Sequence, residues 1–168
     1  MVTRVDYNGY YQLEDENGQP HSPDNDTPAF VTDDGMQAWY QHGVFHREYD
    51  LPAIVIAGGR DEWLIRGWRY RKLSNGPAVK WNDGVTPDEY WQWEIKTDSS
   101  GNPLPGWLPE DMPWYAAPTF LDELSDAELG NIVASPTPTP SPTVEPTPEP
   151  TPEPSVTPEP APEPSPTV

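Results

Sequence analysis

The chain has 168 residues, a net charge of −19 and no cysteine, which excludes disulfides and thiol chemistry. It lacks the run of about 18 apolar residues that a membrane-spanning helix needs. Its acidity opposes long-range attraction to duplex DNA or anionic lipid. Met1 to Tyr11 lack the basic-then-apolar pattern of a signal peptide, so we expect a cytoplasmic protein or one packaged from a cytoplasm.

The charge is distributed unevenly along the chain. Residues 1–38 carry −7 and residues 97–168 carry −12, whereas residues 39–96 are neutral because eight acids balance eight bases. We therefore predict a neutral folded centre with acidic flanks, which favours solubility. The alternative, an acidic mimic of nucleic acid, would need this charge on the folded surface.

The N-terminal segment is rich in tyrosine and is predicted to form an edge strand beside the first hairpin. Residues 14–28 are polar, and Asn17-Gly18 is a hairpin signal. Asp24 to Asp26 resemble the start of a calcium loop. However, Ala29 and Gly35 occupy the positions where such a loop needs glycine and glutamate, so we interpret this stretch as an ordinary loop.

A repeated unit occupies the centre of the chain. Tryptophan comes four residues after a glycine, a second glycine comes four residues later, and the next unit begins seven residues after the proline of a Pro-Ala pair. One copy contains Gly35, Trp39, Gly43, His46-Arg47 and Pro52-Ala53, and the next contains Gly59, Trp63, Gly67, Tyr70-Arg71 and Pro77-Ala78. Such self-similarity is the sequence signature of a repeat fold.

Turn signals and strand-forming runs predict the structure of each unit. Asp34-Gly35, Gly58-Gly59 and Asp83-Gly84 supply the positive φ angles of tight hairpin turns, and β-branched and aromatic residues flank them. We predict an all-β fold, an antiparallel repeat meander of hairpins, in which the second glycine of each unit reverses the chain again. Equivalent tryptophans should form a ladder of Trp39, Trp63 and a displaced Trp91.

The pattern W-x3-G-x2-H-R-x4-P-A resembles a divergent MORN-type hairpin repeat, a family common in bacteriophages and large DNA viruses. Gly43, His46, Arg47, Pro52 and Ala53 match one copy, and Gly67, Arg71, Gly76, Pro77 and Ala78 match the next. The resemblance covers roughly residues 14–96, with repeats at about 14–38, 39–62 and 63–96. Glu14 and Ser22 replace the tryptophan and arginine in the first copy. The resemblance implies a β-meander with an interaction role and no catalytic residues.

Aromatic residues crowd the end of the repeats. The alternation in Tyr90-Trp91-Gln92-Trp93-Glu94-Ile95 predicts one final strand with Trp91, Trp93 and Ile95 on the same face. These side chains are expected to belong to the core. The alternative is an exposed tryptophan row that binds sugars or a partner.

A different pattern follows the repeats. Residues 119–133 are the predicted C-terminal helix, with Ser125 to Glu128 as a capping box and Gly130 shortening or breaking it. Fourteen of the 34 residues in 135–168 are proline, which predicts a disordered, extended tail beyond a folded domain of residues 1–134.

No catalytic or cofactor motif is recognised, and no metal site is predicted. His42 and His46 have a spacing that suits zinc on a helix. Here Gly43 intervenes in a hairpin pattern, so the two rings need not converge, and His21 is the only other histidine.

Bases are concentrated in one segment, where they alternate with aromatic residues. Arginine beside aromatic residues is typical of interface hot spots. The predicted interaction residues are Arg66, Trp68, Arg69, Tyr70, Arg71 and Lys72. The alternative is that these bases pair with the protein's own acids. Because Arg69 and Arg71 lie by a turn, we expect both to tolerate charge reversal.

Together these patterns predict a non-enzymatic protein-interaction module, encoded by a bacteriophage or virus, whose unknown protein partner has an acidic surface. One alternative is a virion or surface component whose proline-rich tail projects from an anchored domain. Another is a carbohydrate or cell-wall binder that uses stacked tryptophans.

Overall fold

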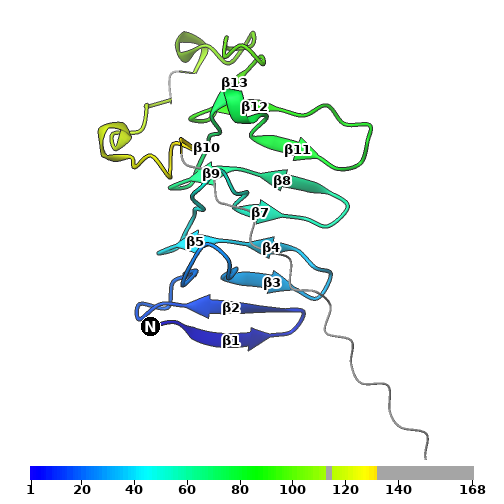
Figure 1. The fold of residues 1–168 in the computed structure, drawn as a ribbon, viewed down its shortest axis with the longest axis vertical. Coiled ribbons are helices and arrows are strands. Elements are labelled where there is room, and N and C mark those ends of the chain that lie inside the picture. The colour runs from blue at the N-terminus through cyan, green and yellow to red at the C-terminus, as the bar shows by residue number, and fades with distance from the viewer. Residues whose placement is uncertain (113–114, 132–168) are drawn as a thin grey trace, which may run out of the picture. The chain divides into compact units, whose positions relative to one another are not determined.

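The computed structural model describes residues 1–112 and 115–131 (Figure 1). Within them lie strands β1 to β13 and three short 3-10 helices, Leu73–Asn75, Pro109–Asp111 and Leu121–Glu123. The predicted all-β, antiparallel hairpin fold is confirmed. In the part of the chain described, no helix has the length and apolar character to cross a bilayer.

Seven strands form one antiparallel sheet in the order β1-β2-β3-β4-β7-β8-β11. Their bounds are Thr3–Tyr7, Tyr10–Glu14, Phe30–Thr32, Gln37–Ala38, Ile54–Val55, Arg60–Glu62 and Val79–Trp81. The expected N-terminal edge strand is a complete hairpin, β1–β2, in which Tyr7 pairs with Tyr10. The meander thus begins one hairpin earlier than the repeat pattern indicates.

Three short hairpins line up along one side of this sheet (Figure 1). They pair β5 (Tyr40–Gln41) with β6 (Val44–Phe45), β9 (Leu64–Ile65) with β10 (Trp68–Arg69), and β12 (Tyr90–Gln92) with β13 (Ile95–Thr97). Gly43 and Gly67 have a φ of 84° and follow His42 and Arg66, whose φ values are also positive. Two successive positive φ angles are what a type I′ hairpin turn requires, which explains the second glycine of each unit.

The Pro-Ala pairs anchor the tryptophans of the repeat. The N–H of Trp39 donates to Ala53 at 2.8 Å, and the N–H of Trp63 donates to Ala78 at the same distance. Leu13 donates to Ala29 in the same way, so Leu13 occupies the tryptophan position of the first copy. The sequence alignment that assigned Glu14 to that position is therefore wrong by one residue.

Each repeat tryptophan is buried against an arginine. Trp39 and Trp63 are 4% and 8% exposed. The guanidinium of Arg47 lies 3.5 Å from the ring centroid of Trp39, and that of Arg71 lies 3.8 Å from the ring centroid of Trp63. The tryptophans are core residues, as predicted, but arginines rather than neighbouring indoles cover their rings.

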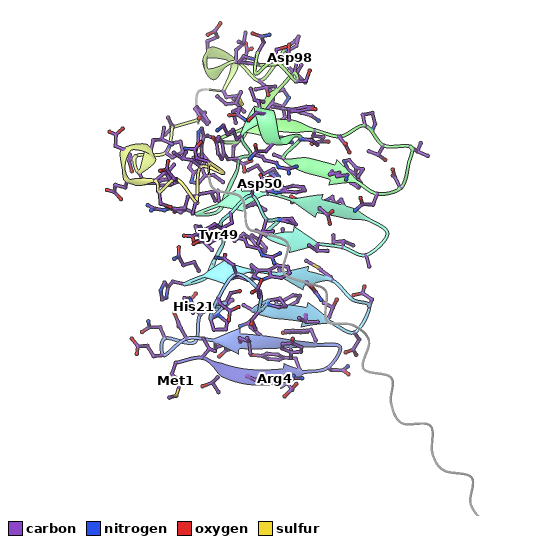
Figure 2. The ribbon with its side chains drawn as sticks, viewed as in Figure 1. Met1, Arg4, His21, Tyr49, Asp50 and Asp98 are labelled. Carbon is purple, nitrogen blue, oxygen red and sulfur yellow. The ribbon has the colours of Figure 1, made fainter. Side chains whose placement is uncertain are left out.

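The same arginines also fasten the loop that leads to the next Pro-Ala pair. Arg47 donates to the carbonyl oxygen of Pro52 at 3.0 Å, and Arg71 donates to that of Pro77 at 3.2 Å. Arg71 also makes two 2.8 Å bonds to the carboxylate of Asp50, which Figure 2 labels. Each arginine therefore ties the ring of its unit to the following loop, and Arg71 also binds Asp50 in the preceding unit.

A second repeated contact joins each unit to the next. The Nδ1 of His21 accepts the N–H of His42 at 3.2 Å, and the Nδ1 of His46 accepts the N–H of Arg66 at 3.1 Å. In the last unit Tyr70 stacks on Trp93 with the ring centroids 4.1 Å apart. The residue at this position always supports the turn of the following hairpin.

The last unit departs from the predicted single strand. Trp93 and Glu94 both have positive φ and form a turn, so the chain reverses between β12 and β13. Trp91 packs on Ala78 and Val79, as Leu64 packs on Ala53 and Ile54. Trp91 therefore takes the place of Leu64 rather than extending the tryptophan row.

The predicted C-terminal helix is not formed between residues 119 and 131. Ser125 and Glu128 do form the reciprocal capping box, through 2.9 Å and 3.2 Å bonds. Gly130, whose φ is 68°, then ends this segment after a single turn. A capping box alone does not stabilise a helix here, because the first helical turn is unfavourable unless further turns follow it. Residues 132–133 and the tail at 135–168 lie outside the described residues.

The arginine contact predicts unequal effects for two neighbouring charge reversals. Arg71→Glu places a carboxylate against Asp50, where the two native side chains are 13% and 9% exposed. We expect it to lower the free energy of unfolding by roughly 3–5 kcal/mol, as for other broken buried pairs. The matched Lys72→Glu change affects an exposed bond to Asn131 and should cost no more than about 0.5 kcal/mol. A loss in urea unfolding for Arg71→Glu as small as that expected for Lys72→Glu would contradict this assignment and restore the expectation that Arg71 tolerates reversal.

His46 predicts a pH dependence of stability. Burial lowers its pKa below the ordinary 6.5, an effect that Arg66 reinforces and that Glu128 and Glu48 oppose. The folded protein therefore holds neutral His46, and stability should fall as the pH drops below about 6.5, because the unfolded chain then binds the proton more readily. His46→Asn keeps an acceptor for Arg66 but cannot titrate. Urea midpoints at pH 7.5 and 5.5 should differ less for this variant than for the native chain; equal differences would contradict the prediction.

Candidate binding site

In the structure, part of the predicted basic segment makes contacts within the protein, and part of it lines a pocket. Arg66 lies at the turn of β9–β10 and donates to Glu128 at 2.7 Å. Arg71 forms an ion pair with Asp50 and covers the ring of Trp63. The ring of Tyr70 stacks on that of Trp93. Arg69 likewise pairs with Glu62 and Glu94, so all three arginines of this segment pair with the protein's own acids. Their role in binding a partner remains a prediction.

Trp68 and Arg69 instead line a pocket of about 620 Å³ at the last unit of the meander. The other lining residues come from the β9–β10 turn, from β12, from the β12–β13 turn, and from two segments that follow the repeats. They are Gly67, Trp91, Glu94, Trp107, Tyr115, Ala116, Ala117, Pro118, Thr119 and Phe120. Five aromatic side chains thus surround one concavity.

The rings of the pocket support one another. Trp107 stands edge-on to Trp91 with centroids 4.9 Å apart, and Tyr115 is edge-on to Trp68 at 6.4 Å. Trp91 is only 7% exposed, so it forms the floor, while the other rings are partly exposed. Such perpendicular pairs are favourable because the positive edge of one ring meets the negative face of another.

An ion-pair network runs along one wall of the pocket. Arg69 donates to Glu94 at 2.9 Å and to Glu62 at 3.2 Å, and the Glu62 side chain is only 3% exposed. Burial acts to lower the pKa of Arg69, but the two carboxylates outweigh it and raise the pKa. Arg60 also donates to Glu62, at 2.5 Å, so two arginines face two carboxylates and the network is electrically balanced within a strongly acidic protein.

The wall of the pocket formed by residues 115–120 is held in place by the segment that follows it in the chain, residues 125–130. Burial alone would raise the pKa of Glu128, but its bonds to Arg66 and Ser125 lower it, so the carboxylate stays ionised. Tyr49 donates its N–H to Ala127 at 3.0 Å, and Asn75 donates to Gly130 at 2.9 Å. These bonds clamp residues 127–130 onto the repeats and position Phe120, whose ring lies 5.1 Å from the Arg66 guanidinium.

Sequence reasoning found part of this site and missed the rest. Trp68 and Arg69 were identified from local composition. Trp107 and Tyr115 lie in irregular segments with no period to reveal which faces they present, and Phe120 lies in the segment predicted as a helix that the structure does not form. Glu94 carried a signal in principle, because it stands at a turn position that glycine fills in the two preceding units.

The pocket can bind but shows no catalytic arrangement among the described residues. Its two charged side chains, Arg69 and Glu94, neutralise one another, and the remaining lining side chains are apolar, aromatic or hydroxylated. The alternative of an exposed tryptophan row at Trp91 and Trp93 is not favoured, because Trp91 is buried and Trp93, which is partly exposed, stacks on Tyr70.

The chain was also compared with known proteins. No family model matches it, and neither the curated proteins nor the solved structures contain a significant match. The resemblance to MORN-type repeats therefore stays a prediction.

Proposed function

We propose that this protein is a non-enzymatic interaction module that binds an extended, proline-containing segment of a partner protein in the aromatic pocket. The observation that carries the proposal is the composition of the pocket: partly exposed rings of Trp68, Trp107, Tyr115 and Phe120 around about 620 Å³, with one neutralised ion pair. Interface cores are enriched in aromatic residues and depleted in unpaired charge.

The shape of the preferred ligand follows from the chemistry of the rings. Proline-rich peptides are already extended before binding, so they lose little entropy when they dock on aromatic grooves. Their rings and backbone carbonyls suit indole faces and the Trp or Tyr donors at ring edges. A bulky globular contact would need a larger flat surface than this concavity offers.

An acidic residue beside the bound proline is part of the proposal. Arg69 is 36% exposed at the pocket wall, so an incoming carboxylate can share its guanidinium with Glu94. Complementary charge of this kind acts mainly on the association rate. The basic segment led us to expect a partner with an acidic surface. In this proposal the partner's acidic group contacts Arg69 alone, rather than the whole of residues 66–72.

The resemblance to MORN-type repeats supports a bacteriophage or large-virus origin for this module. The alternative of a virion or surface component depends on the proline-rich tail, which lies outside the described residues. Detection of the protein in purified particles would favour that alternative.

The pocket can be tested by removing one wall at a time. Trp68→Ala and Tyr115→Ala each truncate a ring of the pocket, and Tyr7→Ala truncates a 45% exposed tyrosine of β1 as a matched control. The full-length variants, checked for folding by circular dichroism, are screened against proline-containing peptides and against a glycan array. We expect selected peptides to bind the native chain and Tyr7→Ala equally and each pocket variant at least about tenfold more weakly.

Two results would contradict the proposal. Glycan binding that is lost in the pocket variants would establish the carbohydrate alternative in its place. Peptide binding that is the same in all variants, or no peptide binding at all, would show that the interaction surface lies elsewhere.

A further inference from the structure

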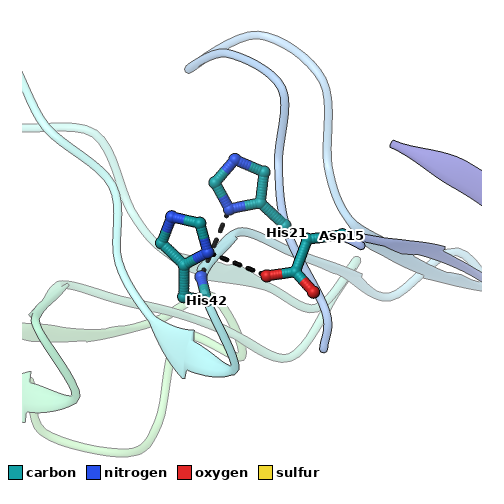
Figure 3. A group of neighbouring side chains, drawn as sticks. All are labelled: Asp15, His21 and His42. Carbon is teal, nitrogen blue, oxygen red and sulfur yellow. Dashed lines mark hydrogen bonds and ion pairs between the residues drawn. The ribbon is translucent and has the colours of Figure 1, made fainter. Parts of the chain in front are cut away.

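A cluster of two imidazoles and a carboxylate lies near the start of the meander, away from the aromatic pocket. Figure 3 shows Asp15 and His21, from the loop after β2, facing His42 from the turn of β5–β6. His42 Nδ1 lies 2.8 Å from an oxygen of Asp15, and the rings of His21 and His42 have centroids 4.3 Å apart. One ligand atom from each residue lies within 4.8 Å of the other two.

The carboxylate of this cluster is held in a fixed orientation. One oxygen of Asp15 accepts the N–H groups of Asn17 and Gln19 at 2.9 Å and 3.0 Å, which leaves the other oxygen to face His42. The Asp15 side chain is 7% exposed, whereas that of His42 is 66% exposed. The cluster therefore combines a rigid, buried carboxylate with an imidazole that solvent can reach.

A second copy of the same loop shows that the histidines are not needed to build it. Asp98 accepts the N–H groups of Ser100 and Asn102 at 2.8 Å and 2.9 Å, and Gly101, like Gly18, has a positive φ. Both loops follow the pattern D-x2-G-x-P, but Leu104 stands in the second loop where His21 stands in the first.

The backbone bonds of the two loops also correspond. His21 donates its N–H to Leu13 at 2.9 Å, and Leu104 donates its N–H to Lys96 at 3.0 Å. Asp98 lies at the opposite end of the meander from His21 (Figure 2). The loop thus forms with an apolar residue in the histidine position. His21 also supports the turn of the following hairpin, as His46 does. Neither the loop nor this repeated contact accounts for the His42 ring, which faces Asp15 and His21.

We propose that Asp15, His21 and His42 bind a divalent transition-metal ion of the zinc class, with solvent completing its coordination. Two imidazoles and one carboxylate are a donor set that suits such ions, and three protein ligands with an open position are common at zinc sites that bind further molecules. The site joins the loop of the first unit to the turn of the second.

The geometry requires only a small rearrangement. Zinc bonds of about 2.0–2.2 Å place tetrahedral ligand atoms roughly 3.4 Å apart, whereas the present atoms lie between 2.8 and 4.8 Å from one another. The exposed His42 ring can turn to make this adjustment. Coordination through Nδ1 of His21 would replace the bond that this atom now accepts from the N–H of His42.

Zinc titration of the full-length chain tests the proposal. The chain is first treated with a chelator and dialysed, and binding is then measured by calorimetry. The variants are His42→Asn, which tolerates the positive φ of the turn, and Asp15→Asn, with Asp98→Asn as the matched loop without histidine. We expect one strong site in the native chain and in Asp98→Asn, and binding at least about tenfold weaker in the other two variants.

The three histidines provide an internal control by NMR. On addition of zinc, the ring signals of His21 and His42 should shift, while those of the buried His46 should not. Binding that survives unchanged in His42→Asn, or absence of binding at 1 mM zinc, would overturn the proposal. Ring signals that stay fixed while zinc binds would assign it to the protein's many carboxylates and overturn the proposal equally.

Discussion

The contact between an arginine guanidinium and an indole face is the interaction on which the repeats depend. Arg47 on Trp39 and Arg71 on Trp63 each close a unit whose strands are only two or three residues long. Strands this short supply few ladder bonds, so a meander built from them needs another source of cohesion. The stacked arginine provides it by excluding water from the ring and by bonding the carbonyl of the following proline.

This contact also explains why the arginine cannot be exchanged for another base. A planar guanidinium can lie flat on an indole and still direct N–H groups outward in its own plane. In Arg71 those groups reach both Pro77 and the two carboxylate oxygens of Asp50. A lysine could satisfy the charge of Asp50 but could not cover Trp63 and bond Pro77 at the same time.

Regular spacing made the hairpins, the turns and the buried tryptophans predictable, because the positive φ at Gly43 and Gly67 is a conformation that glycine itself favours. The prediction failed where local and nonlocal signals conflict. Tyr90 to Ile95 alternate like a strand, yet Trp93 and Glu94 adopt the turn that the preceding hairpins impose at this position.

The candidate sites were harder to predict than the fold because they depend on contacts between units. His42 was compared with His46 at a spacing of four, whereas its neighbours in space are Asp15 and His21 in the preceding unit. Similarly, no sequence period relates Trp68 to Tyr115. A register for the whole meander is needed before such pairs can be recognised, and the one-residue error at Leu13 shows how easily that register is lost.

Both candidate sites lie where the repeat departs from its own pattern. At the last unit, Trp91 replaces a leucine and Glu94 replaces a turn glycine, which supplies a wide aromatic floor and the carboxylate that holds Arg69. At the first unit, Leu13 replaces the tryptophan and Ser22 the arginine, so that unit lacks the stacked pair and is closed by the Asp15 loop instead. The regular units of the middle close on their stacked arginines, whereas the first and last units, which lack that pair, carry the two candidate sites.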